Sequence, residues 1–189
     1  MSRHTHHKRH DIRPHNEAYG GGPLGMTDVG GECFEAFGAD ALTVNGYLGS
    51  DGIEPLLKVC AEKDKGIFVL VKTSNKSSGE LQNLLLEGGE SIYGRMACMC
   101  DEWGEKLPGD YGFTGVGAVV GATYPEQLAE LRREHPSIFF LVPGYGAQGG
   151  GAQGLVGAFN KEGLGAVVNS SRAIMCAYNK LNGEHCSDS

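Results

Sequence analysis

From about residue 40 onward, two kinds of segment alternate along the chain. Continuous apolar runs, such as GIFVLVK at Gly66–Lys72, are typical of strands buried on both faces. The segment YPEQLAELRRE at Tyr124–Glu134 instead shows helical spacing, with proline in its first turn. The pattern predicts strands at Ala41–Tyr47, Gly66–Lys72, Val116–Ala122, Ile138–Val142 and Ala166–Asn169, and helical segments at Ile53–Lys63, Glu80–Glu105 (interrupted near Gly88-Gly89) and Tyr124–Glu134.

This alternation predicts a parallel sheet with helices packed outside it. Two architectures satisfy it, an open doubly wound sheet and a (β/α)₈ barrel. Each predicted strand is followed by a cluster of small or polar residues. Chemistry spread over several strand ends is typical of the barrel, whereas an open sheet concentrates it at one switch point. We therefore predict the α/β class and the TIM-barrel family, with an incomplete barrel of about five to six of the eight strands.

Composition narrows the function classes. Glycine occurs 31 times, mostly in GG or GxG clusters, where the backbone turns sharply or approaches a ligand closely. The net charge is −7 and no stripe of Lys and Arg occurs, which argues against nucleic acid as a partner. The sequence contains no apolar run of about 18 residues, the length that a membrane-spanning helix needs. The first residues do not form a secretory signal. We expect a cytoplasmic protein whose six cysteines are reduced, mostly buried and bind no metal.

A glycine-rich segment, PGYGAQGGG at Pro143–Gly151, directly follows a predicted strand. Glycines allow successive backbone N–H groups to point into one concavity, which suits a phosphate. The last predicted strand ends in NSSR at Asn169–Arg172, and arginine offers a two-pronged contact to phosphate oxygens. In a barrel, the last two strand-end loops commonly form a phosphate site. We predict such a site here; a glycine-rich surface loop with a solvated arginine is the alternative.

Two further segments carry weaker signals. Thr73–Asn75, in the sequence KTSN, could donate and accept hydrogen bonds at a strand end, although a cap for the next helix is an equal alternative. Lys8 and Asp11 are three residues apart, and a lysine near a carboxylate stays protonated and can donate a proton. A surface ion pair is the alternative. A metal-binding tract or an expression tag would explain the histidines at His4, His6, His7 and His10.

Five segments in order, ALTVNGYLGSDG, KGIFVLVKTSN, VVGAT, PGYGAQGG and NSSR, resemble the bacterial type 2 branch of the orotidine 5′-phosphate decarboxylases. The resemblance covers about Phe37 to Ala177. The segment HKRHDIRPHNEAY then falls where that family carries its catalytic pattern D-x-K-x-x-D-I-x-x-T. The resemblance implies decarboxylation of orotidine 5′-phosphate to UMP in pyrimidine biosynthesis, without metal or cofactor, by a cytoplasmic homodimer.

The resemblance also implies roles for individual residues. Lys8 matches the lysine that protonates the carbon left by the departing CO₂. Asp11 matches the aspartate that reaches into the neighbouring subunit's site, and Ser74 resembles the serine that hydrogen-bonds the pyrimidine ring. The residues that would hold the base edge and the phosphate are Pro143, Gln148 and Arg172.

The start of the chain departs from the family pattern. His6 stands where the first aspartate belongs, and His15 stands where threonine belongs. Two initial strands and a closing C-terminal helix of the family have no counterpart. We therefore expect an N-terminally truncated chain with a His-rich segment at 1–10, a partial barrel domain at 11–180 and a polar tail at 181–189.

Two other functions remain open. The first is a catalytically inactive fragment that keeps a phosphate-binding and UMP-binding half-barrel. The second is a phosphosugar lyase or isomerase on the same barrel. The pairing of KTSN with GAQGG argues against this second alternative, because a sugar-phosphate enzyme has little use for a pyrimidine-reading segment.

Overall fold

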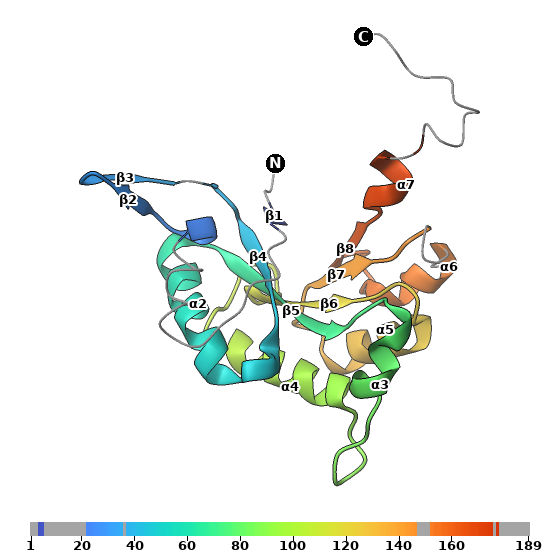
Figure 1. The fold of residues 1–189 in the computed structure, drawn as a ribbon. Helices are drawn as coiled ribbons and strands as arrows, with labels where there is room; N and C mark the ends of the chain where they lie inside the picture. Colours follow the sequence, from blue (N-terminus) through green and yellow to red (C-terminus); the bar gives the residue numbers. More distant parts are fainter. Residues whose placement is uncertain (1–3, 6–21, 36, 147–151, 176, 178–189) are drawn as a thin grey trace.

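A parallel sheet of six strands, in the order β1-β4-β5-β6-β7-β8, forms the centre of the molecule (Figure 1). The computed structural model describes residues 4–5, 22–35, 37–146, 152–175 and 177. All five neighbouring pairs of strands are parallel. The strands are β1 (His4–Thr5), β4 (Ala41–Val44), β5 (Gly66–Lys72), β6 (Val116–Val120), β7 (Phe140–Pro143) and β8 (Ala166–Asn169).

The strand order decides between the two predicted architectures. Neighbours in this sheet follow one another along the chain, without the reversal that creates the switch point of a doubly wound sheet. The sheet also curves, so that its two edges rise on either side of the middle strands (Figure 1). The predicted partial barrel is therefore confirmed, with six strands in the part of the chain that the structure describes.

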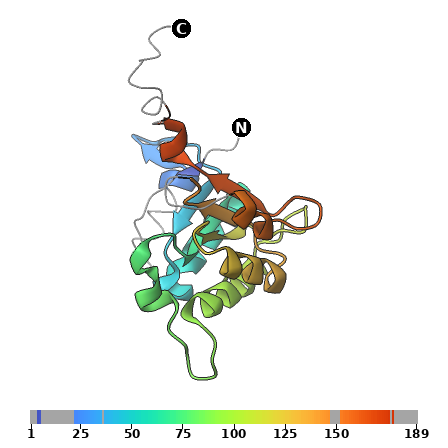
Figure 2. The ribbon, with the colours of Figure 1, turned by 90° about the vertical axis from the view of Figure 1, so that its right-hand side faces the viewer.

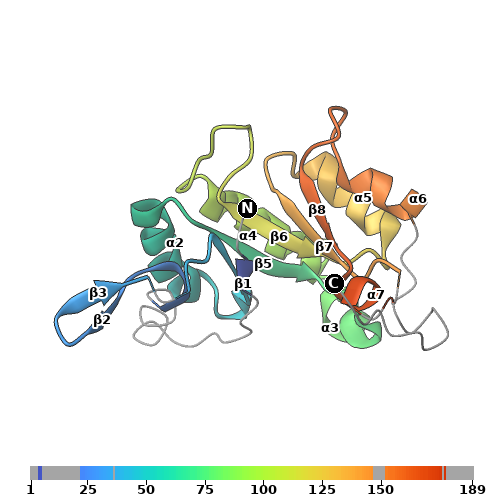
Figure 3. The ribbon, with the colours of Figure 1, turned by 90° about the horizontal axis from the view of Figure 1, so that it is seen from above.

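Helices cover one face of this sheet, which we call the outer face (Figures 1 and 2). The opposite face, which Figure 3 shows from above, is called the inner face. Helix α4 starts where the Ser91 hydroxyl accepts a hydrogen bond from Gly94 N, and α5 starts with Pro125, whose missing N–H costs nothing there. The helices are α2 (Ser50–Lys63), α3 (Gly79–Gln82), α4 (Ile92–Gly104), α5 (Pro125–Glu134), α6 (Ala152–Leu155) and α7 (Ser171–Met175), and the 3₁₀ turns are η1 (Gly46–Leu48), η2 (Lys76–Ser78) and η3 (Val156–Ala158).

Strand β5 has the bounds that the sequence predicts, but its burial differs from the prediction. Val69 and Val71 point to the outer face and are fully or almost fully buried in the helix-covered core. Phe68 and Leu70 point to the inner face and remain partly exposed. The expectation that this strand is buried on both faces was wrong, because the helices that pack on it, α2 and α4, contact the outer face.

The predicted long helical region at 80–105 is two helices, α3 and α4, separated by a loop at residues 83–91. Gly88 and Gly89 both have positive φ, which permits the tight return of this loop. Figures 1 and 2 show the loop projecting away from the sheet, below α3 and α4. The predicted interruption is therefore confirmed.

One element was not predicted. An antiparallel hairpin of β2 (Thr27–Val29) and β3 (Glu32–Phe34) extends away from the central sheet on the side of α2 (Figure 1). Its two-residue turn is Gly30-Gly31, with φ of 68° and 89°. Two glycines between short β-prone runs are a strong hairpin signal, so the sequence did contain the information.

Candidate functional site

The carboxyl ends of β5, β6, β7 and β8 meet along one edge of the sheet. We call residues 72–75, 121–124, 143–146 and 169–172 the strand-end rim. Backbone hydrogen bonds join its segments: Gly121 N donates to Lys72 O at 2.7 Å, and Ala122 N donates to Pro143 O at 2.8 Å. The hydroxyl of Ser170 donates to the carbonyl of Tyr145 at 3.1 Å. The predicted convergence of four strand ends on one side of the molecule is confirmed.

Ser74 lies in the segment of the rim that follows β5, and it is half-buried. Its carbonyl accepts a hydrogen bond from Thr123 Oγ1 at 3.4 Å. A Cβ added at Gly121 would lie 2.8 Å from the Cα of Ser74, so only glycine allows the two strand ends to approach this closely. No hydrogen bond joins the Ser74 hydroxyl to another described residue, and this hydroxyl is therefore available to a ligand.

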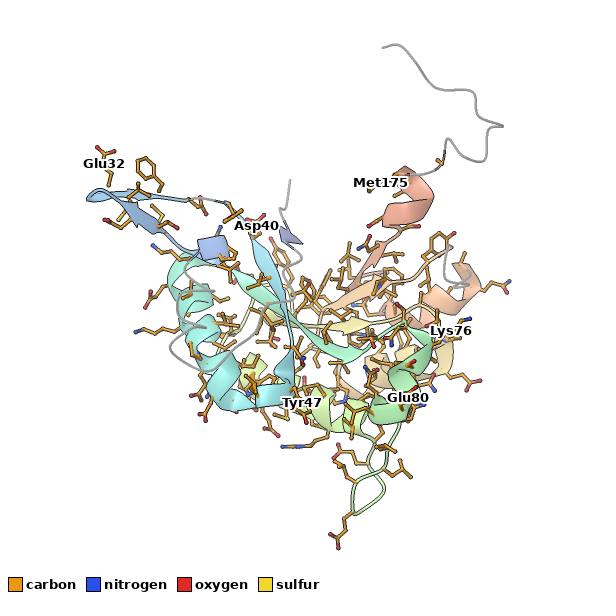
Figure 4. All side chains as sticks on the ribbon, viewed as in Figure 1. Glu32, Asp40, Tyr47, Lys76, Glu80 and Met175 are labelled. Atoms are coloured by element: carbon orange, nitrogen blue, oxygen red, sulfur yellow. The ribbon has the colours of Figure 1, made fainter. Side chains whose placement is uncertain are left out.

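Short side-chain bonds fix the residues on either side of Ser74. Gln82, at the end of α3, accepts from Thr73 N at 3.0 Å and donates to Thr73 Oγ1 at 2.8 Å. Thr73 Oγ1 in turn donates to Asn75 Oδ1 at 2.6 Å. Asn75 is the N-cap residue of η2 but makes no side-chain capping bond. The alternative of a helix cap is therefore wrong for Asn75, whose side chain accepts a hydrogen bond from Thr73 within the loop. Lys76 and Glu80, labelled in Figure 4, mark the end of the molecule where this loop lies.

Pro143 is the last residue of β7 and pairs in register with Asn169 of β8. Gly144 and Gly146, which follow it, have φ of 95° and 76°, a region that residues with a side chain rarely adopt. Arg172 lies in the first turn of α7, directly after β8; its backbone is described and its side chain is not. The structure thus brings Ser74, Pro143 and the backbone of Arg172 to one rim.

Three of the predicted site residues, Lys8, Asp11 and Gln148, lie outside the described residues. Strand β1 ends at Thr5 and pairs in parallel with β4, so the segment HKRHD follows the carboxyl end of a strand of this sheet in the sequence. The roles predicted for these three residues remain predictions.

A cavity of about 690 Å³ lies along the inner face and reaches the rim at the end of β8. Its wall is largely apolar, with Phe68, Leu141 and Val167 among the lining residues. Its polar end is formed by Asn169–Ser171. An apolar cavity with a few polar groups at one end is typical of small-molecule sites. The cavity does not include Ser74 or Pro143, so it accounts for only the β8 side of the candidate site.

Lys72 is a residue of this region that the sequence did not single out. It is completely buried at the end of β5, where the register with β6 shifts between Leu70 and Lys72. Lys72 pairs with Val120, whose side chain belongs to the helix-covered core. Burial lowers the pKa of the Lys72 ammonium below its ordinary value. A lysine as the last residue of an otherwise apolar strand was the sequence signal that could have identified Lys72.

No group of three or more His, Cys, Asp or Glu side chains in the described part of the chain is placed to hold a metal ion. None of the helices described is both long enough and apolar enough to cross a membrane.

The chain is similar to proteins of one family in sequence and in fold. Residues 29–182 match the profile of the orotidine 5′-phosphate decarboxylase / HUMPS family. The orotidine 5′-phosphate decarboxylase of Rhodopirellula baltica is 47% identical over 176 residues, which are 93% of this chain and 57% of that protein. The corresponding protein of Caldicellulosiruptor bescii is 44% identical over 171 residues, 90% of this chain and 56% of that protein.

The chain thus spans somewhat more than half the length of these curated relatives. Among solved structures, the OMP decarboxylase of Leishmania donovani superposes with a TM-score of 0.73 at 32% identity, covering 94% of this chain and 64% of that one. The agreement extends over strands β4 to β8 and the rim that they form. The chain belongs to the orotidine 5′-phosphate decarboxylase / HUMPS family.

Proposed function

We propose that this chain carries the nucleotide site of an orotidine 5′-phosphate decarboxylase, a carboxy-lyase that converts orotidine 5′-phosphate to UMP and CO₂. The observation that carries the proposal is the meeting of Ser74, Pro143 and the start of α7 on one rim, in a chain of this family. Ser74 would hydrogen-bond the pyrimidine ring through its unengaged hydroxyl. Pro143, Gln148 and Arg172 would hold the base edge and the phosphate.

The chemistry requires one bond to break and one to form. The bond between C6 and the carboxylate breaks, CO₂ departs, and the electron pair stays on C6. The Lys8 ammonium would stabilise this carbanion and then protonate it, and Lys8 would regain its proton from solvent. Phosphate binding far from C6 supplies energy that orients the ring. The partner subunit's copy of Asp11 would complete the charge network in a homodimer, and the reaction would run in the cytoplasm without metal or cofactor.

Titration with UMP, combined with an assay of orotidine 5′-phosphate turnover, tests the proposal. Replacing Arg172 with alanine should weaken UMP binding by at least about tenfold and leave uridine binding unchanged, because a charge-assisted contact is lost only when phosphate is present. Arg133→Ala is the matched control, since Arg133 is exposed on α5 and pairs with Glu134. An equal loss of UMP and uridine binding in Arg172→Ala would show that Arg172 does not contact phosphate.

A second candidate function is UMP binding with little or no turnover. His6 favours it, because a histidine at this position cannot hold the Lys8 ammonium by attraction as an aspartate would. We expect turnover by the 189-residue chain to be absent or very slow. We also expect that His6→Asp alone does not restore it. Robust turnover by the purified chain would contradict this candidate and establish the first one.

A further inference from the structure

Lys72 is a buried cation whose described neighbours include no carboxylate within ion-pair distance. Its Nζ donates to Ser78 Oγ at 3.1 Å and to Asn83 Oδ1 at 2.9 Å. It also lies 4.2 Å from the centre of the Tyr124 ring, within the range of a cation–π contact. Three acceptors therefore surround the three N–H groups of the ammonium, which makes its burial tolerable.

The first of these contacts leads to the loop that carries Ser74. Ser78 Oγ and Tyr124 Oη are 3.0 Å apart, and Tyr124 Oη donates to the carbonyl of Asn75 at 3.3 Å. Since the Tyr124 hydroxyl donates its one hydrogen to the Asn75 carbonyl, the Ser78 hydroxyl must donate to Tyr124 Oη. A lone pair of Ser78 Oγ then accepts from the Lys72 ammonium. The bonds run in one direction, from Lys72 through Ser78 and Tyr124 to the backbone of the residue after Ser74.

The second contact reaches the same loop from its other side. Asn83 accepts from Lys72 directly after the end of α3, and the preceding residue, Gln82, holds Thr73 through two hydrogen bonds. The carbonyl of Lys72 itself accepts from Gly121 N at 2.7 Å, which joins the loop to the end of β6. Thr73 is thus held by Gln82, the neighbour of the Lys72 acceptor Asn83, and Asn75 is held by Tyr124, which lies beside both Ser78 and the Lys72 ammonium.

An apolar side chain would fill this position at lower cost, because burying an ammonium without an ion-pair partner is unfavourable. What Lys72 adds is directional bonding to two elements that fix Thr73 and Asn75. The register shift between Leu70 and Lys72 places the side chain toward α3 and Tyr124, on the outer side of the sheet. The ammonium therefore supports the loop from the outer side of the sheet, through Ser78, Asn83 and Tyr124.

We propose that Lys72 is a positioning residue for nucleotide recognition, which orients the Ser74 hydroxyl toward the pyrimidine through Ser78, Tyr124 and Asn83. This inference rests on the proposed function, because it assigns the ligand of Ser74 as a pyrimidine. It makes Lys72 selective in its effect: the base is read less well without it, whereas the phosphate side of the rim, at β7 and β8, is unaffected.

The experiment compares three variants of the full chain by calorimetric titration with UMP and with ribose 5-phosphate. Lys72→Met keeps the length of the side chain and removes the ammonium; we expect UMP affinity to fall about tenfold or more, with ribose 5-phosphate affinity within about twofold of wild type. Tyr124→Phe keeps the ring over Lys72 and removes only the hydroxyl, so a smaller fall in the same direction is expected. Lys58→Met, on the exposed side of α2, is the charge-matched control and should change neither affinity.

Amide hydrogen exchange provides a second measurement that needs no ligand. Thr73 N is protected by its bond to Gln82, and exchange at Thr73 should accelerate in Lys72→Met and Tyr124→Phe while exchange in β6 and β7 stays slow. This readout also applies to Tyr124→Phe alone if Lys72→Met fails to fold. Unchanged exchange at Thr73, or an equal loss of both ligands in folded variants, would overturn the proposal. If wild type shows fast exchange at Thr73 already, the proposal fails as well.

The two levels of inference fail in different ways. If wild-type protein binds UMP no more tightly than ribose 5-phosphate, the proposed function is contradicted, whatever the hydrogen exchange shows. Wild-type protein that prefers UMP, combined with variants that keep this preference, would leave the proposed function intact and overturn the role of Lys72.

Discussion

The two faces of the central sheet are built from the same strands, yet they differ in what covers them. On the outer face, Val69, Ala118 and Phe140 are at most 1% exposed beneath the helices. On the inner face, Val167 is 45% exposed and lines the cavity of about 690 Å³. The outer face therefore contributes most of the buried apolar area, and the inner face leaves space that a ligand or another chain can fill.

Among the residues that the structure describes, two charged side chains are buried in the outer layer. Lys72 and Arg132 are both buried there, with the Lys72 ammonium 4.2 Å from the Tyr124 ring centre and the Arg132 guanidinium 4.0 Å from that of Phe140. Burial lowers the pKa of both groups. The outer layer thus removes these two charged groups from water, whereas the inner face leaves apolar side chains such as Val167 exposed.

The largest expected effect concerns stability, and it uses two neighbouring phenylalanines on opposite faces. Phe140→Ala should lower the free energy of unfolding by about 3–5 kcal/mol, because it leaves a cavity in the helix-covered core and removes the ring beside Arg132. Phe139→Ala should cost clearly less, since Phe139 is partly exposed and loses edge contacts with Phe68 and Phe113. Urea denaturation measures both. Equal costs would mean that the inner face is as closed as the outer one.

The next effect concerns self-association. We expect the 189-residue chain to associate through its inner face, because exposed strand edges and apolar surface recruit other chains, here a second copy. Val167→Lys should shift sedimentation velocity profiles toward the monomer without lowering the melting temperature. Leu85→Lys is the control that should leave the profile unchanged, because Leu85 is apolar and even more exposed than Val167 but lies in the loop at 83–91. A monodisperse wild-type monomer with a sharp cooperative melt would refute the prediction.

A smaller effect is the pH dependence that Lys72 contributes. The pKa of Lys72 in the folded chain lies below the ordinary value of 10.5. At pH values between these two pKa values, the unfolded chain therefore binds more protons than the folded one. The free energy of unfolding of wild type, relative to Lys72→Met, should therefore rise as pH increases toward 10.5. Tyr93 and Tyr124 are the groups whose rings face Lys72, and both are present in the two proteins. A difference that falls with pH would contradict a lowered pKa.

The smallest effect is chemical and reports on the closure of the outer layer. Burial raises the pKa of the Cys60 thiol to about 12, and it raises that of Cys100 further. Because the thiolate is the reactive form, both should resist a thiol reagent at about pH 8 until the chain unfolds. Cys33, exposed in β3, should react first. Mass spectrometry of protease digests after brief labelling distinguishes the sites; early modification of Cys60 would show that the outer layer opens readily.

The sequence predicted a large part of the fold because strand and helix periodicity are local properties. Residues 66–72 form a strand with the predicted bounds, and the last strand begins at Ala166 as predicted. Of the cysteines that the structure describes, Cys60 and Cys100 are buried and Cys98 is half-buried, whereas Cys33 is exposed in the hairpin that was not predicted. The candidate site was predictable where it followed strand ends, as at Ser74 and Pro143, since parallel strands bring their carboxyl ends to one edge.

By itself, the sequence determined where β4 to β8 of the central sheet lie, that these strands run parallel, and which residues stand at their ends. The tertiary structure alone decided that helices close only one face of β5, although its apolar run reads as buried on both. It alone decided the direction of the Lys72 side chain, because the register shift that turns it outward arises from pairing with β6. The support of Ser74 comes from Gln82 and Tyr124, which lie far from it in sequence, and packing brings such partners together where no local pattern records them.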